Sequence, residues 1–264
     1  MTRKIKRTRD FELSLDIRND GFIRPPREAQ RNWLLNTALT EAAENLATLD
    51  KLAARFVPGG PGWSGADRAQ AVLADEDIME AWQIPLMQAM AAAVCASHGD
   101  ILEIGFGRGI SAEFIQQQGV RSHTVIECND AIVATGFKAW RERYPERDIR
   151  LAHGLWQDLL GGLGRFDGLF FHTYPLNQDE AIEQIGTSAT FAEHFFAQAA
   201  AHLREGGVFT YLSNEMDSLG RTHQRRLFEH FSEIQVRIVR GLPLPADVAD
   251  AWWADSMAVV KAVK

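Results

Sequence analysis

The stretch "ILEIGFGRGIS", residues 101–111, decides how most of this chain folds. Its apolar start is typical of a short buried strand, and a helical pattern begins after Gly109. Between the two, Gly105, Gly107 and Gly109 predict a turn. Glycine lets a backbone turn tightly and approach a ligand closely. The stretch therefore predicts a cofactor-binding turn between a strand and a helix.

Strands and helices continue to alternate down to the end of the chain. Six more strand-like segments follow, which are "SHTVIECND" (122–130), "DIRLAHGLW" (148–156), "FDGLFFHTYP" (166–175), "LREGGVFTYLSN" (203–214), "IQVRIVRGL" (234–242) and "DSMAVVKAVK" (255–264). Together with residues 101–104 they predict the α/β class, with a mainly parallel seven-stranded sheet and helices on both faces. Ligands of such sheets bind at the carboxyl ends of the strands, so the residues after these segments are the candidate site.

Two acidic residues beside the glycine turn favour one class of cofactor. Glu127 ends the strand after the glycines, where a carboxylate can accept both hydroxyls of a ribose. Dinucleotide enzymes use a different glycine spacing and bind a pyrophosphate at the helix start. Glu103 precedes the turn and would repel a phosphate, but it suits the ammonium group of S-adenosylmethionine. The sequence therefore predicts S-adenosylmethionine and not NAD.

The composition limits the compartment and the partners. A net charge of -7 and a pI near 5.6 argue against a general nucleic-acid binder, which needs a basic face. Cys95 and Cys128 give no disulfide framework and have no metal-site spacing around them. No apolar run reaches the about 18 residues of a membrane span, and the start lacks a signal-peptide core. We expect a cytoplasmic protein that acts on a small molecule and binds no nucleic acid, membrane or metal.

The first 74 residues differ from the rest and are predicted to form a helical N-terminal arm. Leu34, Leu35 and Leu39 recur at helical spacing, whereas the basic start "TRKIKRTR" is expected to be a frayed terminus. "VPGGPGWSG", residues 57–65, breaks the chain before a second domain, residues 75–264. The arm is either a lid over the site or a dimer arm, so a homodimer through it is one expectation.

Several segments together resemble guanidinoacetate N-methyltransferase and a fungal arginine methyltransferase branch of the same group. They are "ILEIGFGRGIS", "VIECNDAI", "HGLWQDL", "FDGLFFHTYPLNQDE" and "LREGGVFTYLSN", and the resemblance covers roughly residues 75–264. It implies a Rossmann-like class I methyltransferase with an N-terminal lid. The cofactor contacts it implies are Glu103, Gly105 and Gly107 at the methionine end, Glu127 at the ribose, Leu155 and Trp156 at the adenine, and Gly109, Cys128 and His172 beside them.

The acceptor end of the site departs from that family. The two carboxylates that hold a guanidinium there are replaced by Gln83 in "WQIP" and by His172 in "HTYP". A guanidinium loses its proton only above about pH 12, so it needs a strong negative field to become a nucleophile. One carboxylate about 4 Å from a cation contributes roughly 4 kcal/mol at an effective dielectric of about 20. Loss of both carboxylates therefore disfavours a guanidino acceptor.

A histidine in this place favours a neutral nucleophile, because an imidazole with an ordinary pKa of about 6.5 is an effective base at neutral pH. Taking the proton from an indole nitrogen would push electron density to carbon 3, which could then attack the methyl group. The specific expectation is methylation of indole carbon 3 in a tryptophan-derived compound such as a cyclic dipeptide. The expected catalytic residues are His172 and Tyr174, and the expected substrate contacts are Trp33, Met79, Trp82, Gln83, Met87, Thr173 and Glu215.

Three alternatives stay open. Glu215 in "SNEMDS", residues 213–218, could supply the missing negative charge, in which case a guanidino or amine metabolite would be methylated on nitrogen. A chain that has lost both family carboxylates could also be a non-catalytic subunit that binds S-adenosylmethionine. A protein-arginine methyltransferase fits least, because the neutralised pocket disfavours a guanidinium.

Overall fold

The computed structural model describes residues 2–7, 11–17, 23–24, 78–176, 180, 188, 190–244 and 255–264. The chain divides into two compact units, residues 1–62 and residues 63–264. The expected domain boundary after residue 74 and the expected helix around Leu34 to Leu39 lie outside the described residues.

The described part of the first unit is an antiparallel sheet. It consists of β1 (Thr2–Arg7), β2 (Phe11–Ile17) and β3 (Ile23–Arg24), with Thr2 opposite Asp16 and Ile17 opposite Ile23. The expectation of a frayed terminus was wrong for these residues. The segment "FELSLDI" alternates apolar and polar residues, which is the period of a strand, and the charges of its neighbour hid that pattern.

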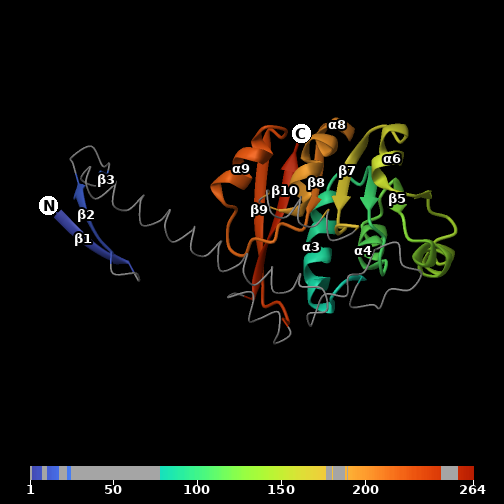
Figure 1. The fold of residues 1–264 in the computed structure, drawn as a ribbon, viewed down its shortest axis with the longest axis horizontal. Helices are drawn as coiled ribbons and strands as arrows, with labels where there is room; N and C mark the ends of the chain where they lie inside the picture. Colours follow the sequence, from blue (N-terminus) through green and yellow to red (C-terminus); the bar gives the residue numbers. More distant parts are fainter. Residues whose placement is uncertain are drawn as a thin grey trace. The chain divides into compact units, whose positions relative to one another are not determined.

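The second unit contains a seven-stranded sheet in the order β6-β5-β4-β7-β8-β10-β9 (Figure 1). The strands are β4 (Asp100–Ile104), β5 (Ser122–Glu127), β6 (Ile149–His153), β7 (Phe166–Phe171), β8 (Leu203–Tyr211), β9 (Glu233–Arg240) and β10 (Ser256–Val263). The first five run parallel, and β10 is antiparallel to both β8 and β9. The predicted α/β class with a mainly parallel sheet is therefore confirmed.

Helices follow the strands on both faces of this sheet. They are η1 (Ala81–Gln83), α3 (Ile84–Val94), α4 (Ile110–Gln117), the π-helix η2 (Ile132–Phe137), α5 (Lys138–Glu142), α6 (Trp156–Leu159), η3 (Leu160–Gly162), η4 (Phe191–Phe195), α8 (Phe196–His202) and α9 (Arg221–Phe228). Pro85 stands in the first turn of α3, where its missing N–H costs nothing. The long α-helix therefore begins there.

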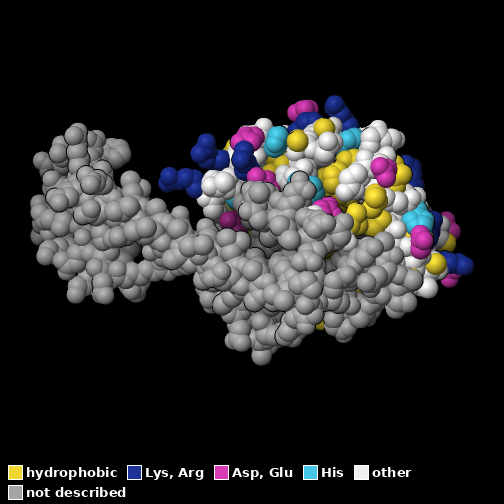
Figure 2. Space-filling view, in the orientation of Figure 1, with side chains coloured by type: hydrophobic (Ala, Val, Ile, Leu, Met, Phe, Trp, Pro, Cys, Tyr) yellow, Lys and Arg dark blue, Asp and Glu magenta, His cyan; other side chains and the backbone are white. Residues whose placement is uncertain are grey.

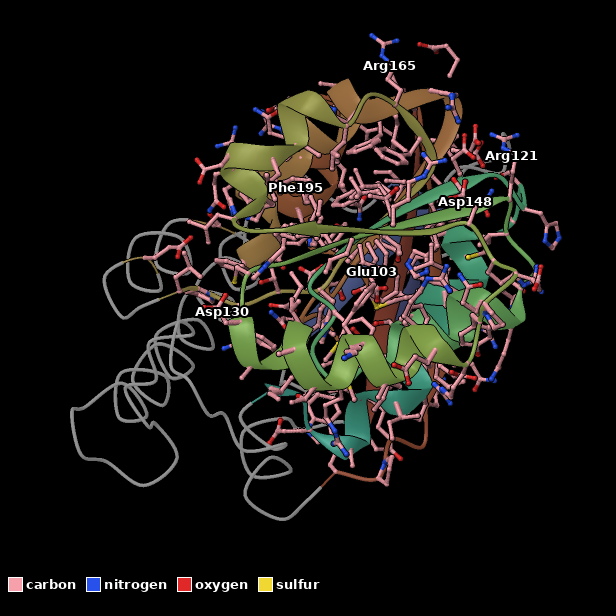
Figure 3. The ribbon with its side chains drawn as sticks, turned by 90° about the vertical axis from the view of Figure 1, so that its right-hand side faces the viewer. Glu103, Arg121, Asp130, Asp148, Arg165 and Phe195 are labelled. Carbon is pink, nitrogen blue, oxygen red and sulfur yellow. The ribbon has the colours of Figure 1, made fainter. Side chains whose placement is uncertain are left out.

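Alternate residues of the central strands pack against two different helical layers. In β7, Leu169 and Phe171 join η4 and α8 in one hydrophobic cluster, while Phe170 joins α3 in another. In Figure 3, Phe195 of η4 and Glu103 of β4 lie on opposite sides of the sheet. A strand with both faces covered is apolar throughout, and this explains why "LFF" in β7 does not alternate.

The amino ends of the central strands are tied together by ion pairs. Arg121 lies 2.6 Å from Asp100 and 2.9 Å from Asp167, and Arg204 lies 2.7 Å from Asp167 and 3.0 Å from Asp100. Figure 3 shows Arg121 at one end of the sheet and Asp130, which follows β5, at the opposite end. These ion pairs are therefore remote from the carboxyl ends of the strands, where a ligand is expected.

The surface of the described residues carries mixed charges. Figure 2 shows acidic and basic side chains interspersed on the visible face, without a broad area of one sign. No helix among the described residues has the length and apolar character needed to cross a membrane.

The ion pairs at the amino ends predict an acid-sensitive fold. A hydrogen bond from Arg121, assisted by others from Ser122 and Arg204, outweighs burial and holds the pKa of Asp100 well below its usual value. Burial by itself raises the pKa of Asp167, but hydrogen bonds from the Asp100 backbone and from Arg204 outweigh this effect. The net result is a pKa below the usual value. A lowered carboxyl pKa contributes stability that is full above the unfolded value of about 3.9 and is lost as the pH falls through the folded value.

We expect urea unfolding midpoints to fall steeply as the pH drops from about 4 to about 2, and Asp100→Asn to flatten that dependence. The control is Asp148→Asn, since Asp148 forms an exposed pair with Arg150 and should leave the pH dependence as it is. Equal slopes for the wild type and Asp100→Asn would contradict the role given to these ion pairs.

Candidate functional site

A cleft opens at the carboxyl ends of four neighbouring strands. It is lined by Gly105 after β4, by Glu127 at the end of β5, by residues 154–157 after β6, and by Thr173 and Tyr174 after β7. It encloses about 430 Å³, part of which is open to solvent. The cleft thus brings together residues that the sequence predicted for the cofactor and for the acceptor.

The floor of the cleft is a close contact between the glycine turn and the exit of β7. Gly105 has a φ of 91°, and a Cβ placed on it would lie 2.3 Å from the carbonyl oxygen of His172. The backbone N–H of His172 donates to the carbonyl of Ile104 at 3.1 Å. Only glycine fits at position 105, because any side chain would collide with that carbonyl and would hold a left-handed φ.

The carboxylate of Glu127 holds the glycine turn in place. Its Oε2 accepts the backbone N–H of Phe106 at 3.0 Å and of Gly107 at 3.2 Å, and its Oε1 accepts that of Asn129 at 2.8 Å. The residue is 6% exposed and lines the cleft. A carboxylate has about four acceptor positions, so these three bonds leave about one position for a hydroxyl donor of a ligand.

Glu103 is placed differently from its expected role. Its side chain is fully buried, accepts a hydrogen bond from Ser111 of α4, and lies 3.0 Å from Nε2 of His123 in β5. It is not among the residues that line the cleft. Burial, followed by the charge of Glu103, raises the pKa of the Cys95 thiol to about 12. The Glu103 carboxylate therefore joins α4 and β5 to β4, and its contact with an ammonium group stays a prediction.

The end of the cleft expected to hold adenine is lined by Cys128, Leu155 and Trp156. The ring of Trp156 packs edge-on against that of Phe195, with 4.9 Å between the ring centroids, and this contact holds Trp156 in the wall of the cleft. Gln157 and Phe191 line the same cleft and were not predicted. Gln157 directly follows the sequence "GLW", residues 154–156, which carries part of the family resemblance. Phe191 carries no signal in the sequence.

The end of the cleft expected to hold the acceptor contains a neutral hydrogen-bonded pair. The hydroxyl of Tyr174 and the side-chain amide of Gln83 bond to each other at 3.1 and 3.3 Å, although 91 residues separate them. The rings of His172 and Tyr174 meet edge-to-face, with 5.5 Å between their centroids, and Nε2 of His172 is buried. The structure therefore gathers His172, Tyr174 and Gln83, while Thr173 and Tyr174 line the cleft itself.

Other predicted contacts lie in the protein interior or outside the described residues. Met79 and Met87 are 6% and 0% exposed and belong to the cluster around α3. Trp82 belongs to the same cluster and donates its indole N–H to Glu80 at 2.7 Å. Gly107 and Gly109 shape the turn without lining the cleft, and Trp33 is not described.

Two carboxylates near this end of the sheet have different surroundings. Glu215 accepts the backbone N–H of Gly220 at 2.9 Å and lies 3.0 Å from Nδ1 of His223, whose other nitrogen meets the Tyr211 hydroxyl. It does not line the cleft. Glu180, which was not predicted, does line it and accepts the backbone N–H of Leu176 at 2.7 Å. Glu180 is thus the better placed of the two to face a ligand.

Burial raises the pKa of the Tyr211 hydroxyl well above its usual value, so this hydroxyl keeps its proton.

Within the described residues, no group of three His, Cys, Asp or Glu side chains is arranged to hold a metal ion.

Comparison with known proteins gives one family. The sequence model described as guanidinoacetate N-methyltransferase matches residues 58–241, which is more than half of the chain. "Protein arginine N-methyltransferase 2" from Emericella nidulans is 29% identical over 150 residues, covering 53% of this chain and 32% of the relative. The protein of the same name from Eremothecium gossypii is 29% identical over 118 residues, 41% of this chain and 28% of the relative. The matched region thus spans about a third of the length of these relatives.

Among solved structures, the N-methyltransferase NodS from Bradyrhizobium japonicum aligns with a TM-score of 0.49 and 15% identity. The alignment covers 70% of this chain and 98% of that one.

The contact between Gly105 and His172 predicts a severe effect of one methyl group. Gly105→Ala should abolish measurable S-adenosylmethionine binding in titration calorimetry and cost about 1–3 kcal/mol of stability, because it adds both a collision and backbone strain. Gly161→Ala is the control, since a Cβ there meets nothing within 4 Å. An unchanged dissociation constant for Gly105→Ala would show that the turn is not part of the cofactor site.

Proposed function

The chain belongs to the guanidinoacetate N-methyltransferase family, and from this premise we propose that it transfers a methyl group from S-adenosylmethionine to a small nitrogen-containing acceptor. Membership confirms the expected class of enzyme, an S-adenosylmethionine-dependent methyltransferase. The observation that carries the proposal is the position of the Gln83–Tyr174 pair and His172 beside the glycine turn of the cleft.

The residues of the cleft fit the parts of S-adenosylmethionine. Glu127 would accept a ribose hydroxyl at its remaining acceptor position, and Cys128, Leu155 and Trp156 would enclose the adenine with apolar and aromatic surface. The turn at Gly105 would admit the methionine part. When bound, the cofactor supplies an electrophilic methyl group on a sulfonium. The remaining chemistry falls to the side chains at the acceptor end.

We assign His172 as the general base. As the acceptor nitrogen or carbon bonds to the methyl carbon, the carbon–sulfur bond breaks and its electron pair stays on sulfur. The proton that the acceptor releases would pass to His172. Tyr174 and Gln83 offer both a donor and an acceptor of hydrogen bonds, so they would orient a neutral N–H or C=O group of the acceptor.

A flat aromatic acceptor is one candidate, and indole carbon 3 of a tryptophan-derived compound is its most specific form. The support is the neutral Gln83–Tyr174 pair together with the aromatic side chains of Trp156, Tyr174 and Phe191 along the cleft. A base at the indole nitrogen would make carbon 3 the nucleophile. Such an acceptor needs no carboxylate, which agrees with the exchange of both family acids.

A cationic acceptor, such as a guanidino or amine metabolite, is the second candidate. It is favoured by Glu180, because that carboxylate lines the cleft. The names of the relatives in Emericella and Eremothecium, protein arginine N-methyltransferases, point to the same chemistry in those proteins. Glu215 offers less support, since Gly220 and His223 already bind its carboxylate outside the cleft.

The assignment of His172 predicts a separation of binding from turnover. His172→Ala should keep the S-adenosylmethionine dissociation constant within a few-fold and lower kcat by about a hundred- to ten-thousandfold. The assay uses methyl-labelled cofactor with a pool of indoles and tryptophan-containing cyclic dipeptides and a pool of guanidino compounds and amines. Mass spectrometry identifies the product.

Turnover that stays within a few-fold of the wild type would contradict the base assignment. Tight cofactor binding by the wild type with no product from either pool would instead favour a non-catalytic subunit.

The two carboxylates predict which acceptor class is used. If the acceptor is a cation, Glu180→Gln should raise its KM about tenfold or more, since a charged hydrogen bond of about 1.5–3 kcal/mol is lost, and should spare neutral acceptors. Glu215→Gln is the matched comparison. It should lower the melting temperature through its bonds to Gly220 and His223 and leave KM unchanged. A loss of cationic turnover in Glu215→Gln and not in Glu180→Gln would reverse these roles.

A further inference from the structure

One groove gathers the exposed apolar side chains of the catalytic unit. Among the described residues, the large hydrophobic side chains that remain exposed are Phe228 at 55% and Val236 at 43%. Both line the same groove between α9 and β9, together with Leu219, Ile234 and Ile238. Exposed apolar side chains that are scattered singly need no explanation, but Phe228 and Val236 share one groove, whose other lining residues include the polar Asp217, Ser218 and Gln224.

The groove lies between α9 and β9, which pack against each other. His223 of α9 contacts Tyr211 of β8, and Leu227 is fully buried in the cluster that contains Val260 of β10. Phe228, the next residue, is exposed to solvent and lines the groove. In β9, Ile234, Val236 and Ile238 share one face by their spacing and form the floor of the groove.

β9 is also the last strand of its sheet. Its one neighbour among the described strands is β10, with Glu233 opposite Val263 and Arg240 opposite Ser256. Figure 1 shows β9 at one side of the seven-stranded sheet. Its other edge presents backbone N–H and C=O groups to which a further strand can bond. The apolar floor and the open edge therefore lie on the same strand.

We propose that β9 pairs antiparallel with β9 of a second copy of this chain, about a two-fold axis perpendicular to the sheet. In the register we infer, Gln235 faces its own symmetry mate, Ile234 faces Val236 of the second copy, and Glu233 faces Arg237 of the second copy. Two-fold symmetry forms each of these contacts twice. Opposite charges and paired apolar side chains across an antiparallel ladder both stabilise it.

The charges of β9 select this register. A shift that places Val236 on the axis moves Glu233 from opposite Arg237 to a diagonal position, and the next shift puts Arg237 opposite itself. Like charges directly opposite each other destabilise a strand pair. A foreign strand would gain the backbone bonds, but only the copy of β9 is certain to provide the complementary order of Glu233 and Arg237.

Pairing would also join the grooves of the two copies. The floors formed by Ile234, Val236 and Ile238 in the two copies would become one continuous apolar surface across adjacent strands. The two Phe228 side chains would project from the helices toward the shared groove.

The test is the association of the full-length protein, measured by sedimentation equilibrium from nanomolar to high micromolar concentration. We expect a monomer–dimer equilibrium in the wild type. Glu233→Arg and Arg237→Glu should each weaken dimerisation about ten- to a hundredfold, because two cross-strand pairs become repulsive at once. Both side chains are exposed, so circular dichroism should show an unchanged fold.

A mixture of the two variants is the decisive measurement. In a mixed dimer, each arginine of the first chain faces a glutamate of the second, so the heterodimer should recover the affinity of the wild type. Glu142→Arg carries the same charge change on exposed α5 and should dimerise like the wild type. The proposal is overturned by a wild type that stays monomeric, by a dimer that neither variant weakens, or by a mixture that fails to associate.

Discussion

The contact between the carbonyl of His172 and the backbone of Gly105 is the constraint on which the site depends. It joins the ends of β4 and β7, the strands that supply the predicted cofactor turn and the predicted acceptor residues. Since a Cβ at Gly105 would lie 2.3 Å from that oxygen, the two segments can approach only through glycine. Glu127 then binds the turn from β5 through the N–H groups of Phe106 and Gly107. The cleft is therefore shaped by backbone packing, and its side chains are free to vary with the acceptor.

Buried charge has a structural role close to this site. Glu103 lies one residue before the end of β4, yet its carboxylate points to the α4 side and meets Ser111 and His123. A carboxylate buried in this way is tolerated only with polar partners, and removing one of them would leave a costly uncompensated charge. The position of α4, and hence of the glycine turn at its start, follows from this arrangement. Glu215 has a comparable role at the start of α9, through Gly220 and His223.

The sheet could be predicted because each central strand is a short, strongly apolar run between turn residues. What the sequence could not give is the face on which a polar residue lies. Glu103 and Ile101 share the α4 side of β4, so proximity to the turn in sequence did not mean proximity to the cleft. Glu180 was missed because a single acid among other polar residues carries no distinguishing pattern, and Gln157 because only its neighbour Trp156 stood out. The pairing of Gln83 with Tyr174 is a long-range contact that no local pattern encodes.

The exchange of charges at the acceptor end has a physical consequence for the whole reaction. The sulfonium of the cofactor is itself positive, so an acceptor that is also a cation must be brought beside it against repulsion, and a carboxylate has to offset this. With Gln83 and His172 both able to be neutral, the nearest compensation among the described residues that line the cleft is Glu127 or Glu180. Glu127 already accepts three backbone N–H groups. In the reaction we propose, the choice between a neutral and a cationic acceptor would thus rest on the single carboxylate of Glu180, which a change of one residue could add or remove without disturbing the glycine turn.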